Sequence, residues 1–418
     1  MFADAMAPPL TGTTAGPVIF GLTCLGLAAG KVPGLKLDRT GIAMLGAIAM
    51  LVFDRFPTAT VIGFINWPTI LLLFGFFVLS AQLRLSGFFD LVAVRLARQL
   101  DQPARFLVIL MLATAGLSAF LNHDIVCFVF TPVVGAALLK QRLNPVPYLI
   151  GLAIASNIGA AATLVGNPQD MMIAQIAGLG FGQYGLWCLV PVLLALTCAC
   201  AIIWRMSRHQ LTASSTEPWS PPTQPFPYDR AHTIKGLVIF GIVIGLFFTS
   251  LPKEIVALTA AAIHLASPKF RTSDLLALVD WPILVLFMAM FVVTGAFQAT
   301  GGGDHLARWL TQAGVPLQSP PVLLTVTALL SNVIGNSAAV MLLLKVANLA
   351  HPPAAYILAL ANSFGGSLII LGSVANIIVV QQARDLGITI GFRDFARLGV
   401  PVTLAAMAAL LLWVMVAG

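Results

Sequence analysis

The hydrophobic positions of this chain gather in long runs that carry few charges, and polar positions concentrate between them. Apolar segments occupy 16–30, 41–53, 67–83, 105–121, 124–139, 149–175 and 186–205, and then 234–250, 255–267, 281–298, 321–334, 338–350, 355–378 and 398–417. Runs of this kind are typical of helices that cross the roughly 30 Å hydrocarbon layer of a bilayer. Short alternating segments, which would indicate transmembrane β-strands, do not occur. The pattern predicts an all-α polytopic membrane protein.

Composition supports this class. Of 418 residues, 59% are hydrophobic and 9% are charged, and the mean hydropathy is +0.97, whereas soluble domains carry about 25% charged residues. The first residues have no basic region followed by a cleavage site, so we expect no cleaved signal peptide. Five cysteines lie in or beside apolar runs without C-x-x-C spacing, which favours small buried side chains over a disulfide framework or a zinc site.

The chain divides into two similar halves. A polar stretch at 206–232 contains "EPWSPPTQPFP", which cannot form a helix. It separates a first repeat (1–205) from a second (233–418). "NWPTILLLFGFFV" at 66–78 recurs as "DWPILVLFMAMFV" at 280–292, "LSAFLNHDIVCFVF" at 117–130 as "LSNVIGNSAAVMLL" at 330–343, and "LAIASNIGAAATLVGNPQDMMI" at 152–173 as "LALANSFGGSLIILGSVANIIV" at 358–379. The constant order of these blocks indicates an internal duplication.

The distribution of basic residues predicts inverted repeats. We expect a re-entrant hairpin at 105–139 in the first repeat and another at 321–350 in the second. Each repeat then has five crossings, an odd number, so the second is inverted. This threading puts 18 of the 22 lysines and arginines on one side, all but Arg55, Lys253, Arg308 and Lys345. By the positive-inside rule that side and the linker are cytoplasmic, and both termini are not. The net charge of +7 therefore reports topology rather than a nucleic-acid partner.

Polar residues inside the apolar segments mark the candidate site. An ionisable group at membrane depth is costly, so it should face a cavity or a partner. The candidates for substrate or ion binding are Asn122, His123, Asp124, Asn157, Thr163, Asn167, Asp170, Asn336, Ser337, Asn362, Ser363, Ser373 and Asn376. They fall at matching places in the two halves, for example at the hairpin tips Asn122-His123-Asp124 and Gly335-Asn336-Ser337.

Residues that interrupt helices lie beside these polar positions. They are Gly159, Gly166, Pro168, Gly335, Gly365, Gly366 and Gly372, and they predict broken helices at 149–175 and 355–378. Broken helices expose free amide and carbonyl groups that coordinate ions and anionic groups. Paired breaks in two inverted halves are the pattern of a secondary transporter with a site at the midplane of the membrane.

The blocks "VPGLKLDRTG", "LNHDIVCFVFTP", "SNIGAAATLVGNPQDMMI" and "LSNVIGNSAAVMLL" resemble the ion transporter superfamily. It holds the divalent-anion/sodium symporters, arsenite permeases and NhaD-type sodium/proton antiporters, and this chain is most similar to bacterial SLC13-like anion permeases. The symporters carry a Ser-Asn-Thr motif at each tip, whose central asparagine is kept here only as Asn336. His123 and Asp170 replace asparagines of the family patterns and add titratable groups. The resemblance implies an elevator mechanism and a homodimer.

Structural roles compete with these functional ones. His123 can hydrogen-bond a backbone carbonyl of the broken hairpin, and Asp124 and Asp170 can cap the helices that follow them. No arginine lies deep in an apolar run, which argues against a dedicated clamp for a dianion.

The sequence predicts a transporter of the inner membrane, and not an enzyme. The expected solute is a small anion, moved with sodium or protons; the alternative is a sodium/proton antiporter or an arsenite exporter. No cofactor is expected beyond sodium ions near Asp124 and Asn336.

Overall fold

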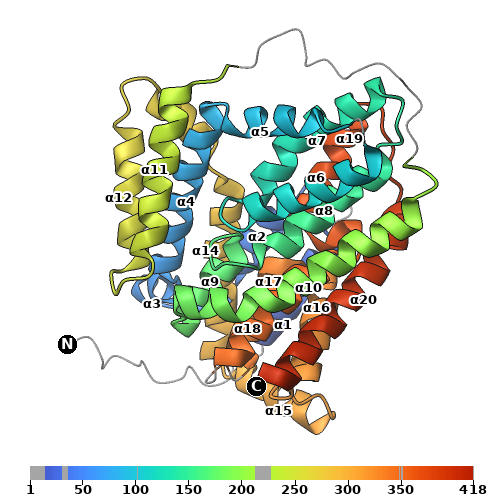
Figure 1. Cartoon of the computed structure of the whole chain (residues 1–418). Coiled ribbons are helices and arrows are strands. Elements are labelled where there is room, and N and C mark those ends of the chain that lie inside the picture. Colours follow the sequence, from blue (N-terminus) through green and yellow to red (C-terminus); the bar gives the residue numbers. More distant parts are fainter. Residues whose placement is uncertain are drawn as a thin grey trace.

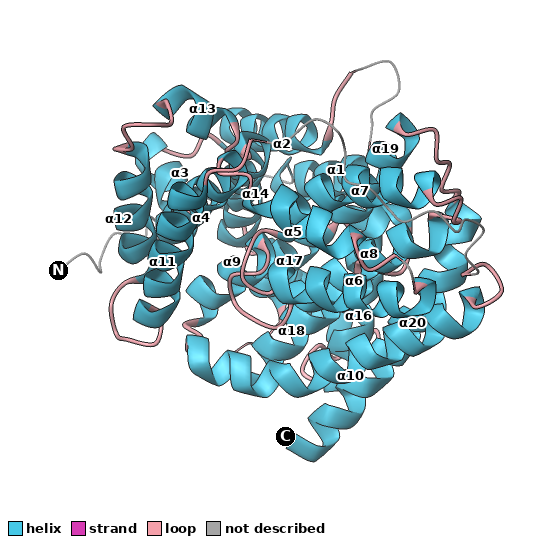
Figure 2. Cartoon of the chain, turned by 45° about the horizontal axis from the view of Figure 1, so that its top comes forward, coloured by secondary structure: helices cyan, strands magenta, loops and turns pink. Residues whose placement is uncertain are grey.

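The computed structural model describes residues 15–30, 36–100, 102–211, 227–347, 349 and 352–417. Within these ranges the chain forms α-helices, one short 3-10 helix and no strand (Figure 2). The all-helical prediction is confirmed. Most of the predicted linker lies outside the described residues.

Among the described residues, ten helices begin before the linker. They are α1 (Ala15–Ala29), α2 (Arg39–Asp54), α3 (Thr58–Phe64), α4 (Trp67–Leu85), α5 (Phe88–Ala97), α6 (Pro103–Ser118), α7 (His123–Lys140), α8 (Val146–Ala160), α9 (Pro168–Ala177) and α10 (Phe181–Ser207).

The helices after the linker follow the same order of long and short elements. They are α11 (Arg230–Leu246), α12 (Lys253–Leu265), α13 (Thr272–Ala277), α14 (Trp281–Ala299), α15 (Gly302–Gln312), α16 (Pro320–Ile334), α17 (Asn336–Val346), α18 (Pro352–Gly365), the 3-10 helix η1 (Ile370–Gly372), α19 (Val374–Asp385) and α20 (Phe392–Ala417).

The packing of the helices repeats between the halves. Each helix of the first half has as its counterpart the helix whose number is higher by ten. Helix α4 packs against α12, and their counterparts α14 and α2 also pack together. The same holds for α6–α8 and α16–α18, and for α7–α19 and α17–α9. Helix α10 packs against its own counterpart, α20. Exchanging each helix for its counterpart therefore reproduces these neighbour relationships, as the three recurring sequence blocks predict.

Equivalent helices begin with equivalent caps. Asn66 Oδ1 accepts the Thr69 amide at 3.0 Å at the start of α4, and Asp280 Oδ1 accepts the Ile283 amide at 3.1 Å at the start of α14. A Trp-Pro pair follows each cap, and proline suits the first turn because that position has no helical partner for its missing N–H. Trp67 and Trp281 are thus the first residues of their helices.

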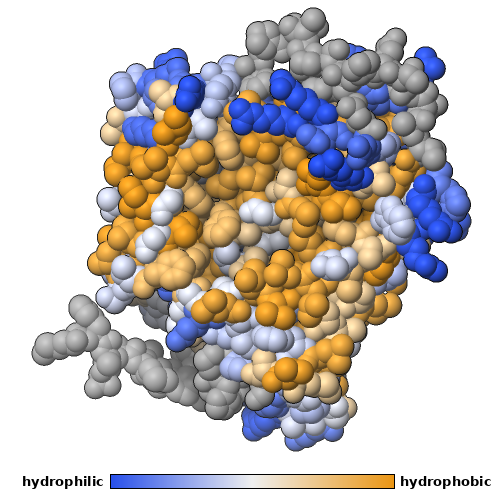
Figure 3. Space-filling view, in the orientation of Figure 1, coloured by the Kyte–Doolittle hydropathy of each residue, from blue (hydrophilic) through white to orange (hydrophobic). Residues whose placement is uncertain are grey.

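Five helices among the described residues, namely α4, α7, α10, α14 and α20, are long and apolar enough to cross a membrane. In Figure 1 the long helices run through the body of the molecule, while α5 lies along the top and α15 at the bottom. Hydrophobic residues cover the middle of the visible face in Figure 3, and hydrophilic residues gather toward its two ends. This distribution fits a body surrounded by lipid.

Two glycines that were predicted to interrupt helices also allow close helix packing. Gly159 lies one residue before the end of α8, and a Cβ there would come within 2.3 Å of the Ala115 backbone in α6. Its counterpart Gly365 is the last residue of α18, and a Cβ there would lie 2.9 Å from Cα of Ala328 in α16. Both glycines let two backbones approach closely at the point where a helix ends in a break.

Candidate functional site

The first hairpin turns at Asn122, between α6 and α7. Asn122 is the N-cap of α7, and its Oδ1 accepts the Asp124 amide at 2.9 Å. His123 Nδ1 lies 3.3 Å from the carbonyl oxygen of Gly166, in the break between α8 and α9. His123 Nε2 lies 3.5 Å from Asp124 Oδ1, an oxygen that is buried and accepts no hydrogen bond in the described part of the chain.

The second hairpin turns at Gly335, between α16 and α17. Gly335 has φ 89°, in the region that favours glycine, and it provides no side chain to cap α17. Asn336 and Ser337 are the first residues of α17. Ser337 Oγ accepts Gln169 Nε2 at 2.8 Å, whereas the buried Asn336 Oδ1 accepts no hydrogen bond from the described residues.

Both predicted broken helices are present. The first is interrupted between α8 and α9, at 161–167, and the second between α18 and α19, where η1 occupies 370–372. Gly166 and Gly372 occupy equivalent places in these breaks. A Cβ on Gly166 would lie 2.1 Å from the Ala160 carbonyl oxygen, and one on Gly372 would lie 2.8 Å from that of Gly366. Each break therefore folds back tightly on the end of the preceding helix.

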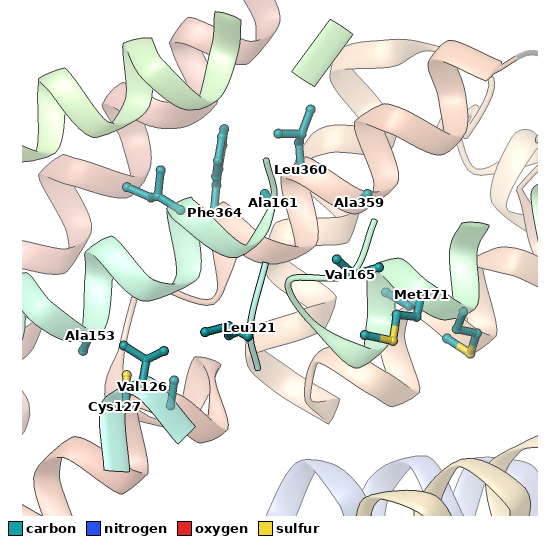
Figure 4. Packing of buried hydrophobic residues seen from close by; sticks show 14 of the residues in the cluster. Leu121, Val126, Cys127, Ala153, Ala161, Val165, Met171, Ala359, Leu360 and Phe364 are labelled. Carbon is teal, nitrogen blue, oxygen red and sulfur yellow. The ribbon is translucent and has the colours of Figure 1, made fainter. Parts of the chain in front are cut away.

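Apolar side chains hold the broken segment in place. In Figure 4, Val165 and Met171 lie at the break that leads into α9, and Leu360 and Phe364 of α18 lie close to Ala161. Val165, Leu360 and Phe364 are each at most 1% exposed. The polar groups of the site are thus embedded in a close-packed apolar surround, in which an unmatched hydrogen-bonding group is costly.

Amide side chains join the two broken helices across the molecule. Asn157 Nδ2 donates to Asn376 Oδ1 at 2.9 Å, and Ser373 Oγ donates to Asn157 Oδ1 at 2.8 Å. Asn376 Nδ2 also donates to the carbonyl oxygens of Gly366 and Ile369. Asn157 in α8 is therefore fixed to the start of α19, and Asn376 closes the second break.

A second connection repeats this arrangement with the halves exchanged. Asn167 Nδ2 donates to Ser363 Oγ at 3.1 Å, and these two residues are the counterparts of Ser373 and Asn157. Asn167 Nδ2 also donates to Asp170 Oδ2 at 2.7 Å, and its Oδ1 accepts the Asp170 amide at 2.7 Å. Asp170 is fully buried, and its Oδ1 accepts no hydrogen bond within the described ranges.

Four helix starts surround one cavity. Its volume is about 60 Å³, and the starts of α7, α9, α17 and α19 line it, together with residues of α1, α2 and α14. The residues from the four starts are His123, Asp124, Pro168, Gln169, Asn336, Ser337, Ser373 and Val374. Helix N-termini carry partial positive charge, which in this cavity is balanced in part by the Asp124 carboxylate.

The predicted site residues divide into three groups. His123, Asp124, Asn336, Ser337 and Ser373 line the cavity, with the backbone at Pro168, Gly335 and Gly372. Asn157, Asn167, Asp170, Ser363 and Asn376 form the buried connections between the broken helices.

The remaining three lie apart from that cavity. Asn122 lines a void of about 10 Å³ with Asn167 and Ser80. Thr163 donates to the Ala119 carbonyl oxygen and borders an apolar pocket. Asn362 is buried, with an Oδ1 that accepts no hydrogen bond from the described residues.

The capping roles considered for the two aspartates are wrong. Asn122 caps α7 and Asn167 caps α9, while Asp124 and Asp170 lie in the first turns of those helices. Adjacent Asn and Asp residues compete for one N-cap position, and both have high preference for it, so the sequence alone does not decide between them. The helix start leaves each carboxylate with one oxygen that accepts no hydrogen bond in the described part of the chain.

Two polar residues of the cavity were not predicted from the sequence. Arg39, the first residue of α2, lines the cavity and is only partly exposed. In the sequence it counts only among the 18 basic residues that the threading places on one side. Gln169, which binds Ser337, follows Asn167-Pro168 in a quoted block. Its position in the first turn of α9, directly after the helix break, is the feature of the sequence that could have indicated a place at the site.

Comparisons with known proteins agree with this architecture. The model of a family described as "Citrate transporter" matches residues 25–356. An uncharacterized transporter of Mycobacterium tuberculosis is 30% identical over 371 residues, which cover 84% of this chain and 86% of that protein. The inner membrane protein YbiR of Escherichia coli is 28% identical over 366 residues, covering 82% and 87%.

A solved structure shows the same fold. The YdaH transporter of Alcanivorax borkumensis superposes with a TM-score of 0.63 at 18% identity, covering 97% of this chain and 98% of that one. The resemblance to the ion transporter superfamily is confirmed by these matches, and the relatives are named as transporters rather than enzymes.

Proposed function

This chain belongs to the citrate transporter family, and from that premise we propose that it is a secondary active transporter of a small anionic solute, coupled to sodium or protons. One observation carries the proposal: both hairpin tips and both helix breaks border a single cavity. A solute held there contacts polar groups from both halves. Movement of these elements together against the remaining helices would then alter access to the cavity, as alternating access requires.

The proposed topology consists of two inverted repeats in the inner membrane, with a cytoplasmic linker and both termini outside. The exchange of neighbours between the halves supports a two-fold relationship. In Figure 1 the equivalent helices α5 and α15 lie at opposite ends of the molecule, which supports an inverted orientation of the second repeat. We propose that the repeats are 1–205 and 233–418, joined by the linker 206–232.

The proposed coupling site is at the first hairpin tip. Asp124 is 7% exposed, lines the cavity, and has an oxygen without a hydrogen-bond donor in the described ranges. A buried carboxylate needs a cation, a donor or a proton. Either a sodium ion or a proton on Asp124 would meet this need, and competition between them would couple transport to one ion gradient. The oxygen of Asn336 across the cavity can complete a sodium site.

The transport unit proposed here contains the two hairpins, the two broken helices, α10 and α20. Contacts between α6 and α8, α16 and α18, and α10 and α20 join these elements closely. Helices α4, α12, α2 and α14 contact one another as well as the transport unit, and we propose that they serve as the scaffold of an elevator and as the interface of a homodimer.

Sodium/proton antiport is the second candidate, and Asp170 is the observation that favours it. Its carboxyl is fully buried, and one oxygen accepts no hydrogen bond among the described residues. Asp124 lies in the hairpin of the first half and Asp170 lies in its broken helix, so each of these two elements contains a titratable group. A transporter that only exchanged cations would use these carboxyls without binding an anion.

A flux screen on the purified protein in liposomes tests the proposal. Sodium and proton gradients would be imposed separately, and citrate, sulfate and arsenite uptake measured along with sodium/proton exchange. Gradient-driven anion uptake supports the proposal. Sodium/proton exchange without uptake of any anion supports the second candidate, and passive currents without coupling would contradict both.

A further inference from the structure

We infer that Arg39 and the start of α17 form the subsite that binds an anionic oxygen group of the solute, such as a carboxylate. This inference deepens the proposed function and rests on it, because it assigns a specificity-determining residue to the same cavity. It gives this role to a residue of α2, a helix outside the hairpins and broken helices.

The position of Arg39 supports the assignment. A Cβ built on Gly335 would lie 3.0 Å from Nη1 of Arg39, so the guanidinium group lies directly against the second hairpin tip. Arg39 lines the cavity, and it makes no ion pair or hydrogen bond with any residue in the described ranges. A partly buried guanidinium without a partner calls for an anion, and its planar donors match a carboxylate in geometry.

The start of α17 differs from the other three helix starts at the cavity. Side chains cap α7, α9 and α19, namely those of Asn122, Asn167 and Ser373. Gly335 offers no such cap to α17. The first amides of this helix therefore remain available to an anion, and the helix dipole favours negative charge there.

Two further side chains in the cavity affect where an anion binds relative to Arg39 and the start of α17. Ser337 Oγ already accepts Gln169 Nε2, so its hydroxyl proton remains free for donation to the ligand. Asp124 is more than nine-tenths buried, and its Oδ1, which lines the cavity, accepts no hydrogen bond from the described residues. With the proposed sodium ion or proton on Asp124, an anionic group would still bind best at the opposite end, beside the guanidinium of Arg39 and the start of α17.

The site combines two structural units. Helix α2 packs against α14 and α1, whereas α17 follows α16 in the second hairpin. An anion bound between them holds the hairpin against α2. Arg39 therefore contributes to binding in this conformation, and movement of the hairpin away from α2 would weaken the site.

Binding to the purified full-length protein tests the inference, with citrate, succinate and sulfate as probes and Arg39→Gln, Arg39→Lys and Arg95→Gln as variants. Arg95 is an exposed arginine of α5 and serves as the matched control. We expect Arg39→Gln to weaken binding by about tenfold or more, because a hydrogen bond to a charged group is lost. Arg39→Lys should weaken it less, and Arg95→Gln should bind as the wild type does. Melting temperatures measured without ligand should be equal.

Three results separate the outcomes. Wild-type affinity in Arg39→Gln would overturn the inference, and so would a wild-type protein that binds none of the three anions, even if it moves another solute down an ion gradient. A binding defect confined to Arg39 in a protein without gradient-driven flux would instead contradict the proposed function while supporting the anion subsite. A preference for citrate and succinate over sulfate identifies the bound group as a carboxylate, and the reverse preference identifies it as an inorganic oxyanion.

Discussion

Asn157 and Asn376 lie 219 positions apart in the chain, and their side chains share a hydrogen bond of 2.9 Å at the contact between the two broken helices. Asn157 is also the acceptor for Ser373, at the cap of α19. The counterpart pair, Asn167 and Ser363, makes the equivalent contact from the other half. Polar side chains from each half of the chain thus bind the helix break of the other half.

The first prediction concerns the stability of this connection. Asn157→Ala removes a donor to Asn376 and an acceptor for Ser373, and each buried group left without a partner costs about 1–3 kcal/mol. We expect a clear fall in melting temperature of the purified protein. The control is Thr325→Ala, an exposed residue whose hydroxyl binds only its own helix backbone. Combining Asn157→Ala with Ser373→Ala should cost less than the sum of the two single changes; strict additivity would mean that the contact contributes nothing.

The second prediction concerns topology. Arg95 in α5 and Arg308 in α15 are both exposed and lie on equivalent helices. In intact cells, a cysteine at Arg95 should react only with membrane-permeant reagents, and one at Arg308 with impermeant reagents too. Labelling of both from outside would contradict the inverted repeat, and the opposite labelling would reverse its orientation.

The third prediction concerns Asn336. Its buried Oδ1 accepts no hydrogen bond from the described residues, so its removal should cost little stability. Asn336→Ala is expected to reduce substrate affinity and flux while expression and melting temperature stay near the wild-type values. A lower melting temperature with unchanged affinity would instead identify Asn336 as a structural amide.

The fourth prediction concerns acid stability at the end of the linker. The Lys269 ammonium group and the His232 amide, which both donate to Asp229, hold the pKa of Asp229 well below its usual range. A lowered pKa stabilises the fold above the unfolded value of about 4, and this stabilisation is lost as the pH falls further. Asp229→Asn should therefore melt below the wild type at pH 7, and the difference should shrink toward pH 3. A difference that stays constant over this range would rule out the ionic contribution.

Hydrophobic runs were sufficient to predict most helices, and glycines with a proline were sufficient to predict both breaks. The apolar segments match helices closely, because burial or lipid contact requires continuous apolar stretches. The pairing of the halves followed from sequence blocks that recur in order, and it correctly matched residues such as Asn157 and Ser363.

The features that were missed depend on three-dimensional neighbours. Arg39 reaches the cavity because α2 begins beside the second hairpin tip, which no local pattern reveals. The close approach of Gly159 to Ala115 could not be predicted, because the two residues belong to different helices. The predicted cap of α7, Asp124, lies two residues after the observed cap, Asn122, because both residue types are equally suited to that role.

The most direct test of the central claim is the dependence of anion flux on pH and sodium in Asp124→Asn. The substitution keeps the shape of the side chain, and Asn122 rather than Asp124 caps α7, so the variant should fold. Uptake into liposomes would be measured for wild type and variant across a series of pH values and sodium concentrations. If Asp124 binds the coupling ion, flux in the variant becomes low or insensitive to both. Wild-type pH and sodium dependence in Asp124→Asn would contradict the account.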